Sequence, residues 1–489
     1  LAGETGAGTV ISGSYFRQGD MLRFRAKITN SNSEEVIFDL KPAITSGEEW
    51  MTSLEDMRQR ILGGTAFILS DPIYMHYIDN TNTPPRYDAL QELIAGMRFF
   101  SPNPPKAIEH FTRGYKIDTT FNYLLLNTTV VYSNSGDISK VDSLIQKLYG
   151  KYETLSPFNR AFADRYRTEV NGDRAGQLRA SKKMAEIIPT SVRFVNWIWH
   201  AFRSNYLDEV LEANTKISPD FSHLQYRIDL TATYHILGEH EKELEVARRG
   251  RRQYPNSRVI LNCEVRALAA MGRTVEIDSL LSENRTMAGN HGNTLSIAAQ
   301  ILWTNSKKRD AVKLIERAVE WHSMRTGDEE KNLRRQYCTA LYQSVVMVDR
   351  TTELQDDPED PMRREIAGSQ RNTRIEYMRE TLNELCKEEP ENLRNIGFKG
   401  IVAALFGDQG DALRVIQELE DLDIPYINRW DKVFQAYIMA ILGHYEEATI
   451  LFEDAFRNGA NYFLGYHYQI ELEGLREYPR FQDFLKPKK

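Results

Sequence analysis

The sequence of 489 residues is poor in cysteine and has no long apolar run. Its three cysteines, Cys263, Cys338 and Cys386, lie far apart, so no disulfide framework is expected and each is predicted to be a structural thiol inside a helix. Such sparse use of cysteine does not distinguish the cytoplasm from a bacterial periplasm. The longest uninterrupted apolar run, Ala436 to Leu442, is far shorter than the roughly 20 residues that a membrane-spanning helix needs.

The sequence also lacks a large excess of charge of either sign. Its net charge is -7, from 62 basic and 69 acidic residues, so there is no global electrostatic reason to bind nucleic acid or an anionic membrane. The best local basic cluster comprises Arg248, Arg249, Arg251 and Arg252, and it is more typical of a solvated helix face. We therefore predict that this region contacts neither nucleic acid nor a membrane.

Signatures of catalysis and of metal binding are missing as well. There is no Gly-x-Ser-x-Gly turn and no His-Glu-x-x-His sequence, and the carboxylates are scattered. His235 and His240 are five residues apart across Gly238, whereas a zinc-binding helix places two histidines four residues apart on one face. We expect the two imidazoles to point in different directions. The sequence therefore predicts a protein that is not an enzyme and has no metal or cofactor.

What the sequence does contain is a helical unit that recurs. Its clearest copies place a small residue, a larger apolar residue four positions on and an apolar or small residue three further on, which is one face of a helix: Ala107-Phe111-Gly114, Ala311-Ile315-Ala318, Ala412-Ile416-Leu419 and Ala448-Phe452-Ala455. Weaker copies begin at Val141, Gln177, Leu207, Glu243, Glu276 and Met378. With one exception, successive copies start 30 to 36 residues apart.

Glycine and proline fall at matching places. Glycines occur where the first helix of a unit must end in a short turn, because glycine readily adopts positive φ: Gly136, Gly172, Gly238, Gly407 and Gly443. Prolines occur where the second helix must stop: Pro189, Pro219, Pro255 and Pro390. The pattern predicts about ten helix pairs with short turns.

One interval breaks this rhythm. Ala311 and Met378 are 67 residues apart, about two periods, and the acidic, proline-containing run from Glu353 to Asp360 lies between them. This spacing predicts a lengthened helix pair around an exposed acidic loop. A docking role for that loop is the alternative to a plain solvated connection.

The first 70 residues have a different character. Val10 to Phe16 and the alternating residues Leu22 to Ile28 flank a Gly19-Asp20 turn, which predicts a β-hairpin with one buried face. A third strand is expected at 36–38, and a helix from Trp50 should cover the apolar face. This is a thin domain whose first strand begins almost at Leu1, so we expect its first half, and any membrane anchor, to lie upstream.

These patterns resemble known families. Residues 86 to about 460 resemble tetratricopeptide repeats in period, glycine turns and closing prolines. The run from Gly13 to Ile28, with the strand and helix that follow, resembles the second half of the TolB-like α/β domain that precedes such repeats in bacterial regulators. The ending Leu475-Arg476-Glu477-Tyr478-Pro479-Arg480-Phe481 resembles the closing segment of that family. The resemblance implies a sensory or interaction region of a larger bacterial signalling protein, and it does not name the output.

The predicted fold is therefore mainly α, an α-α superhelix of tetratricopeptide-like helix pairs preceded by a small partial α/β domain. The expected organisation is a TolB-like part at 1–70, a linker at 71–85, where turn residues cluster, and a repeat array at 86–489. The last helix, Tyr478 to Leu485, is expected to cap the array.

In such an array the first helix of each unit faces the concave groove, where aromatic residues with polar tips suit a peptide. Counting back from the small-residue positions gives the predicted partner-binding residues Tyr123, Phe162, Tyr166, Asn196, Trp199, His200, Gln225, His235, Trp430 and Tyr437. The alternative for each is ordinary packing in the core.

Three functions are compatible with these patterns. The leading hypothesis is a non-enzymatic interaction scaffold that binds a peptide or partner protein in the groove. The alternatives are a small-molecule sensor and a structural component of an envelope assembly. The compartment, cytoplasmic or periplasmic, is left open.

Overall fold

The computed structural model describes the chain except for residues 1–6, 47–48, 70–71, 80–82, 286, 326–329, 354–369, 408 and 423–428. The chain divides into two compact units, Leu1–Arg193 and Phe194–Lys489, here called unit 1 and unit 2. Residues 354–360 of the predicted acidic loop lie outside the described residues. None of the described helices is long and apolar enough to cross a membrane.

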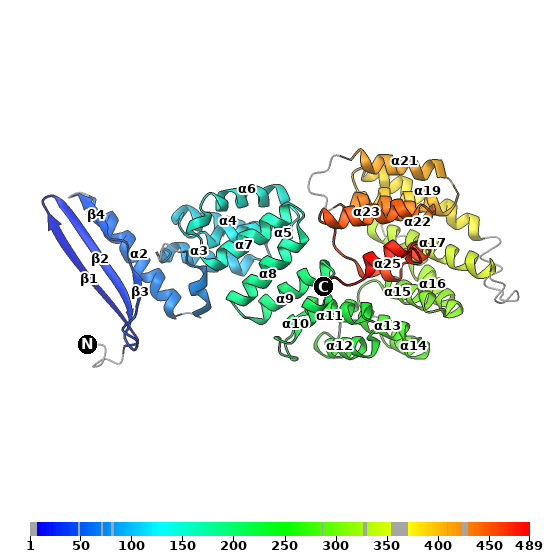
Figure 1. Ribbon diagram of the computed structural model, residues 1–489, viewed down its shortest axis with the longest axis horizontal. Coiled ribbons are helices and arrows are strands. Elements are labelled where there is room, and N and C mark those ends of the chain that lie inside the picture. Colours follow the sequence, from blue (N-terminus) through cyan, green and yellow to red (C-terminus); the bar gives the residue numbers. More distant parts are fainter. Residues whose placement is uncertain are drawn as a thin grey trace. The chain divides into compact units, whose positions relative to one another are not determined.

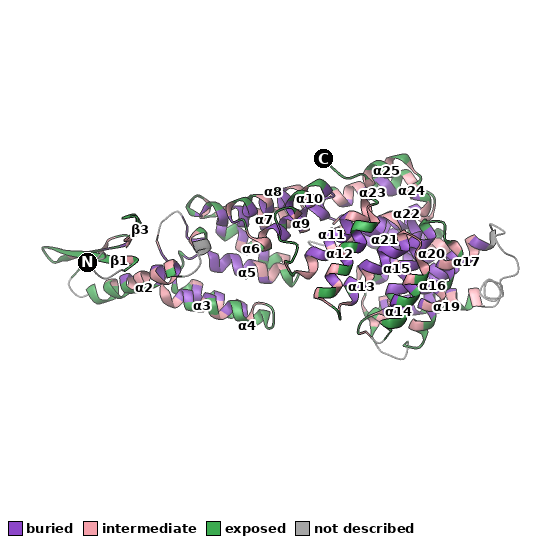
Figure 2. Ribbon diagram, turned by 90° about the horizontal axis from the view of Figure 1, so that it is seen from below, coloured by how far each residue is buried: buried purple, intermediate pink, exposed green. Residues whose placement is uncertain are grey.

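Unit 1 begins with a small antiparallel sheet (Figure 1). The strand β2 (Met21–Asn30) pairs along one edge with β1 (Thr9–Gln18) and along the other with β3 (Val36–Asp39) and β4 (Ala43–Ser46). The predicted hairpin and third strand are confirmed, and β4 was not predicted. Most of β1 is exposed (Figure 2).

The helix α2 (Trp50–Leu69) covers one face of this sheet, as predicted. Ile28 of β2 and Phe38 of β3 have no exposed surface. Gly64 permits the close approach, since a Cβ there would lie 3.0 Å from Cδ1 of Ile28. The alternation read from β2 therefore identified the face that packs.

A short segment then connects the sheet to the helix pairs. It includes the 3-10 helix η1 (Pro72–Tyr77) and the buried Asp79. The Asp79 carboxylate accepts hydrogen bonds from Nδ2 of Asn122 at 2.9 Å, the backbone N–H of Ser156 at 3.0 Å and Nδ2 of Asn159 at 2.8 Å. The end of η1 is thus fixed to the helices that follow, while the boundary proposed at 71–85 stays a prediction.

The helices form ten pairs in the described part of the chain, and in every pair except α17 and α19 a short connection joins the two helices. In unit 1 they are α3 (Tyr87–Phe99), α4 (Pro104–Ile117), α5 (Tyr123–Asn134), α6 (Ile138–Tyr149), α7 (Pro157–Val170) and α8 (Arg174–Ile187). α9 (Ser191–Arg203) contains the boundary between the units. In unit 2 it is followed by α10 (Leu207–Asn214), α11 (Leu224–Ile236), α12 (His240–Gln253), α13 (Arg258–Ala270), α14 (Thr274–Glu283), α15 (His291–Thr304), α16 (Lys308–Ser323), α17 (Lys331–Glu353), α19 (Arg371–Glu388), α20 (Leu393–Leu405), α21 (Gln409–Glu420), α22 (Trp430–Ile441) and α23 (Tyr445–Arg457).

The repeat positions of the four clearest copies are confirmed, whereas the weaker copy predicted at Glu276 is displaced by one residue, because Glu276 is only half-buried and Ile277 has no exposed surface. The small residues of the clearest copies are fully buried where the second helix of a pair meets the first: Ala107, Ala311, Ala412 and Ala448. All five predicted turn glycines have positive φ, from 69° at Gly172 to 99° at Gly407. The lengthened pair is confirmed as α17 and α19, with 23 and 18 residues.

After α23 the chain of unit 2 no longer forms helix pairs. The C-terminal segment, residues 460–489, contains η4 (Leu464–His467), η5 (Ile470–Leu472), α24 (Glu473–Arg476) and α25 (Pro479–Leu485). α25 buries Phe481 against Phe452 of α23, with ring centroids 5.3 Å apart. The rest of the segment runs along the inner helices of unit 2, next to α15 and α22 (Figure 1).

Candidate binding site

The predicted groove residues of unit 1 are core residues. Tyr123, Phe162 and Tyr166 are 9%, 6% and 2% exposed. The ring of Tyr123 stacks on that of Tyr77 at 4.1 Å, and Phe162 packs against Tyr166 at 5.4 Å. These three rings therefore offer almost no surface to a partner in this structure, which agrees with the packing alternative stated for them.

The predicted residues on α9 and α11 differ among themselves. Asn196 is exposed, whereas His200 is 3% exposed. Trp199 is half-buried, with the Arg203 guanidinium 4.0 Å from its ring. Gln225 is half-buried and donates a hydrogen bond to Asp229 at 2.8 Å. Trp199, His200 and Gln225 thus contact neighbours on their own helices, and none of the four residues lines a cavity described below.

Trp430 and Tyr437 both line a hollow of unit 2, although Tyr437, at 6% exposed, is as deeply buried as the rings of unit 1. This inner cavity has a volume of about 450 Å³ and is bounded by the first helices of four successive pairs, α15, α17, α20 and α22, and by the C-terminal segment. Its lining residues are Asn293, Ser296, Ile297, Gln300, His322, Asn332, Arg335, Gln336, Thr339, Tyr342, Gln343, Arg394, Phe398, Ile401, Trp430, Phe434, Tyr437, Phe463, Tyr468, Gln469 and Glu471. The site therefore combines aromatic rings with amide side chains.

The amides follow helical spacing. Asn332, Gln336 and Gln343 lie four and seven residues apart on α17, and Asn293 and Gln300 lie seven apart on α15, so each set occupies one face of its helix. Side-chain amides offer both donors and acceptors, which match the N–H and C=O groups of an extended backbone. Sequence reasoning missed them, although their spacing could have found them.

Charge is unevenly distributed in the inner cavity. Among the described lining residues, Arg335 and Arg394 are basic and Glu471 is acidic. Arg335 donates to Oδ1 of Asn395 at 3.0 Å, while Arg394 is exposed. Gln343 lies eight residues beyond Arg335 on α17, which is about 12 Å along the helix. The two ends of the cavity therefore differ in charge.

The C-terminal segment closes this site by contacts that are distant in sequence. The backbone N–H of Ile470 donates to Gln300 of α15 at 3.3 Å, and the Trp303 indole donates to Glu473 at 3.0 Å. The Tyr342 hydroxyl of α17 donates to Glu471. These bonds fix the segment across several helix pairs, and no periodic pattern marks them in the sequence.

A second cavity, of about 400 Å³, lies on the other side of Glu471. Its lining includes Trp303, Lys308, Arg350 and Glu473, and Arg350 is ion-paired with Glu473. Glu471 lines both cavities, so the C-terminal segment forms the wall between them.

The two histidines across Gly238 come together, contrary to the prediction. Gly238, with φ of 72°, reverses the chain, so that Nδ1 of His235 lies 2.8 Å and Nδ1 of His240 lies 3.3 Å from the same oxygen of Glu243. Glu243 occupies a small-residue position of the repeat and has no exposed surface. It is therefore buried among polar partners from α11, α12 and α13.

Arg266 determines whether this cluster is an ion-pair network or a metal site. Its Nε donates to the other oxygen of Glu243 at 2.6 Å. Burial raises the pKa of Glu243, but the Arg266 charge and the hydrogen bonds from His235 and His240 outweigh burial and lower that pKa to about 2. The ligand atoms of the two histidines and Glu243 lie within 4.8 Å of one another, yet the adjacent guanidinium opposes a second cation. The geometry favours a buried ion-pair network.

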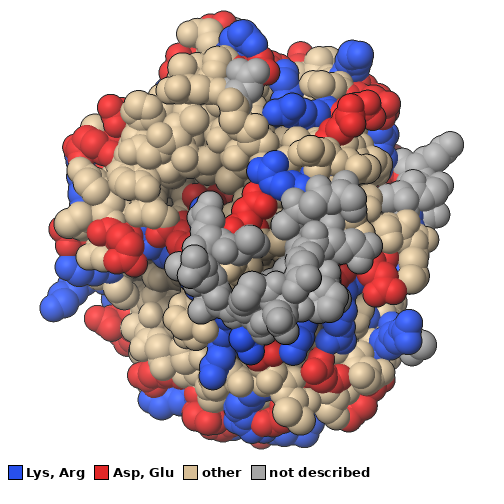
Figure 3. Space-filling model, turned by 90° about the vertical axis from the view of Figure 1, so that its right-hand side faces the viewer, with Lys and Arg blue, Asp and Glu red and all other residues tan. Residues whose placement is uncertain are grey.

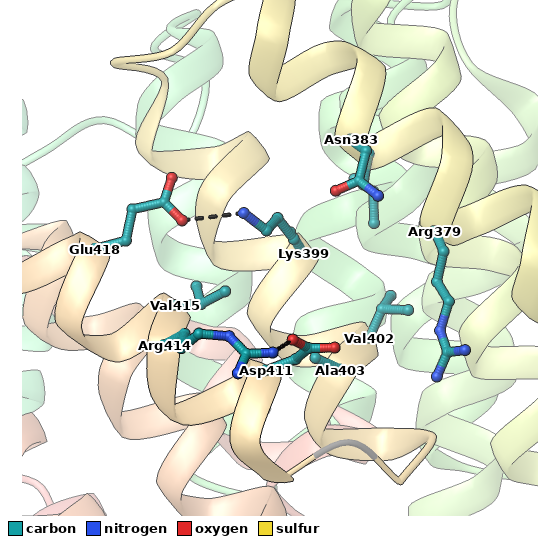
Figure 4. A pocket seen from close by; sticks show the side chains of 10 residues that line it. Arg379, Asn383, Lys399, Val402, Ala403, Asp411, Arg414, Val415 and Glu418 are labelled. Atoms are coloured by element: carbon teal, nitrogen blue, oxygen red, sulfur yellow. Dashed lines mark hydrogen bonds and ion pairs between the residues drawn. The ribbon is translucent and has the colours of Figure 1, made fainter.

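A further cavity, of about 390 Å³, lies between α19, α20 and α21 (Figure 4). Two of its basic side chains have acidic partners: Lys399 is 3.0 Å from Glu418, and Arg414 is paired with Asp411. Arg379 lies on the α19 side. Because most of its charged side chains pair with one another, this cavity resembles a solvated groove between helices more than a ligand-binding site.

The predicted basic cluster on α12 is also largely paired. Arg248 and Arg251 bind Glu264 at 3.0 and 2.9 Å, and Arg249 binds Glu245 at 2.9 Å. On the face shown in Figure 3, Lys and Arg side chains lie among Asp and Glu side chains. Neither observation indicates a surface built for a polyanion.

No protein-family model matches the chain, and no curated protein matches it. Similar solved structures include a tetratricopeptide repeat protein from Parabacteroides merdae, at 11% identity, covering 52% of this chain and 99% of that chain with a TM-score of 0.34. The apo quorum sensor NprR from B. thuringiensis is 16% identical, covers 75% and 97%, and has a TM-score of 0.34. The human IFIT1 dimer with m7Gppp-AAAA is 12% identical, covers 88% and 94%, and has a TM-score of 0.31.

At these identities and scores the neighbours give no argument about a ligand. The arrangement of the chain itself is clear: buried small residues recur at the predicted positions, and positive-φ glycines join the paired helices. The chain has the architecture of a tetratricopeptide-like helical repeat protein that begins with a small four-stranded sheet.

Proposed function

We propose that unit 2 is a non-enzymatic scaffold that binds an extended peptide or a segment of a partner protein in the inner cavity. The observation that supports this most directly is the convergence of four first helices, α15, α17, α20 and α22, on one hollow lined by amides and aromatic rings. Amides can bond to a peptide backbone, and rings supply contact area at low entropy cost. The volume of about 450 Å³ lies within the usual range of ligand pockets.

The test begins with a selection of random twelve-residue peptides displayed on phage, using the whole chain as bait. Selected peptides are then titrated against the unmodified chain and against Phe463→Ala. Phe463 lines the cavity and is 39% exposed, so its removal should weaken binding at least tenfold and change the midpoint of unfolding little. Fluorescence anisotropy measures the affinity.

The matched control is Phe16→Ala, the same change at a 55% exposed residue of β1. It should leave the affinity unchanged. Peptides that bind both variants as tightly as the unmodified chain would place the binding surface elsewhere, and a selection that returns no binder would refute the proposal.

A second candidate function, a small-molecule sensor, is favoured by the closure of the inner cavity by the C-terminal segment, because ligand pockets bury most of a small ligand. A metabolite screen by thermal shift separates the two, since a ligand that binds the folded state must raise the midpoint. A shift that is lost in Phe463→Ala would support the sensor.

The broader assignments stay proposals. The lack of enzymatic activity and of nucleic-acid contact is supported by the ion pairs of the α12 arginines and by the scattered carboxylates. Membership of a larger bacterial regulator rests on the sequence resemblance alone, and so does the expected upstream output module. A role in an envelope assembly has no support from the described residues.

A further inference from the structure

Two buried oxygen atoms at the acidic end of the inner cavity have no hydrogen-bond partner in the described structure. They are Oε1 of Gln343 and Oε2 of Glu471. Gln343 is 2% exposed and Glu471 is 6% exposed, and both residues line the cavity. A buried polar group normally has a partner, so these two acceptors are able to accept hydrogen bonds from a bound molecule that supplies donors.

The other oxygen of Glu471 is already engaged. The Tyr342 hydroxyl, next to Gln343 in the chain, donates to Oε1 of Glu471. This bond holds the carboxylate at the wall between the two cavities, with its second oxygen unpartnered. Both unpartnered oxygens therefore lie buried in the wall of the cavity, and the bond from Tyr342 fixes the position of Glu471.

Nearby cations do not neutralise Glu471 by direct contact. Arg350 is ion-paired with Glu473, and Arg476 donates to the backbone oxygen of Gln469 at 2.6 Å. No hydrogen bond or ion pair joins either arginine to Glu471 in the described structure. Burial accordingly raises the pKa of Glu471, although both arginines and Tyr342 lower it. The carboxyl group lacks the counter-ion that would stabilise its charge.

Tyrosine rings lie near Glu471 in the lining of the inner cavity. Tyr342, Tyr437 and Tyr468 line the cavity; burial raises the pKa of each, and the nearby charge of Glu471 adds to that increase. The electron-rich faces of such rings attract ammonium and guanidinium groups. A neutral donor could satisfy one of the two acceptors, but a cation suits the carboxylate and the rings together.

We propose that the inner cavity anchors its peptide through a lysine or arginine side chain, whose cationic head lies between Gln343, Glu471 and the three tyrosines. This inference rests on the proposed function and adds the residue class that the site selects. Arg335 and Arg394 do not oppose it, because Arg335 lies about 12 Å away along α17 and Arg394 is exposed on α20. They suit an acidic group elsewhere in the same peptide.

The test uses three capped tripeptides, Ac-Ala-Lys-Ala-NH2, Ac-Ala-Nle-Ala-NH2 and Ac-Ala-Glu-Ala-NH2, titrated into the full chain by calorimetry. The lysine peptide should bind at least tenfold more tightly than the norleucine peptide, which has nearly the same shape without the charge. Glu471→Gln keeps an acceptor for Tyr342 and should reduce this preference to less than twofold. Gln343→Leu, which removes the other acceptor, should weaken the lysine peptide and leave the norleucine peptide unchanged.

The matched control is Glu477→Gln, the same change at an exposed residue of the C-terminal segment, and it should preserve the preference. Circular dichroism confirms that each variant is folded. Equal binding of the lysine and norleucine peptides, a preference that survives Glu471→Gln, or no binding of the lysine peptide at millimolar concentration would overturn the inference. Phage-selected peptides that depend on Phe463 but contain no basic residue would overturn it while leaving the proposed function intact.

Discussion

The C-terminal segment should stabilise helices that precede it by more than 150 residues, and Ile470→Ala tests this. Ile470 is 1% exposed, belongs to the core built mainly from α12 to α19, and bonds through its N–H to Gln300 of α15. Removing three buried carbons costs about 2.4 kcal/mol at about 0.8 kcal/mol each. The cavity that remains brings the expected loss to about 2–5 kcal/mol.

Urea denaturation followed by circular dichroism measures this loss, and hydrogen exchange shows where it falls. Protection should decrease in α15 and α17 as well as in α22. The control is Ile450→Ala, the same change at a 45% exposed residue of α23, which should cost less than about 0.5 kcal/mol. If Ile470→Ala is equally mild, or if only residues after 430 lose protection, the segment does not stabilise the inner helices.

Three other predictions follow from buried groups. Ala448→Arg should destabilise unit 2 by at least about 3 kcal/mol in urea, because Ala448 has no exposed surface and the new side chain would be overpacked and poorly solvated. Burial, together with the charges of His235 and Arg476, lowers the pKa of His467 to about 4, whereas the value in the unfolded chain is about 6.5. The folded state should therefore lose up to about 3 kcal/mol of stability as the pH falls from 6.5 to 4. Thermal midpoints measured across that range should depend less on pH in His467→Gln. Asp79→Ala should cost unit 1 at least about 2 kcal/mol by leaving three donors unpaired, and an unchanged urea midpoint would show that η1 is not anchored.

The helix pairs were predictable because local spacing determines them. A small residue every 34 or so positions is needed wherever two helices approach closely, and glycine is favoured where φ must be positive. Even so, the turns at Asn205 and Ser306 have φ of 60° without glycine, so glycine does not mark every turn, even one that precedes a clear copy such as that at Ala311. The four-residue strand β4 is too short to show a clear alternation.

The candidate site was predicted only in part, for a physical reason. Periodicity identifies the face of a helix, but it does not indicate whether solvent or another helix covers that face. Tyr166 and Tyr437 occupy comparable inner positions and are 2% and 6% exposed, but of the two only Tyr437 also lines the inner cavity. The C-terminal segment was missed because its partners are distant in sequence, as in the bond between Trp303 and Glu473.

The position of the C-terminal segment also has a consequence for biosynthesis. Nδ2 of Asn205, just after α9, donates to the backbone oxygen of Lys486, 281 residues later. At roughly 5–20 residues per second, a ribosome needs on the order of tens of seconds to make the intervening chain. The surfaces of α11, α15 and α17 that contact this segment therefore leave the exit tunnel long before the residues that will cover them. During that interval they are the surfaces to which a chaperone would bind, and unit 2 cannot reach its final state until translation of this segment is complete.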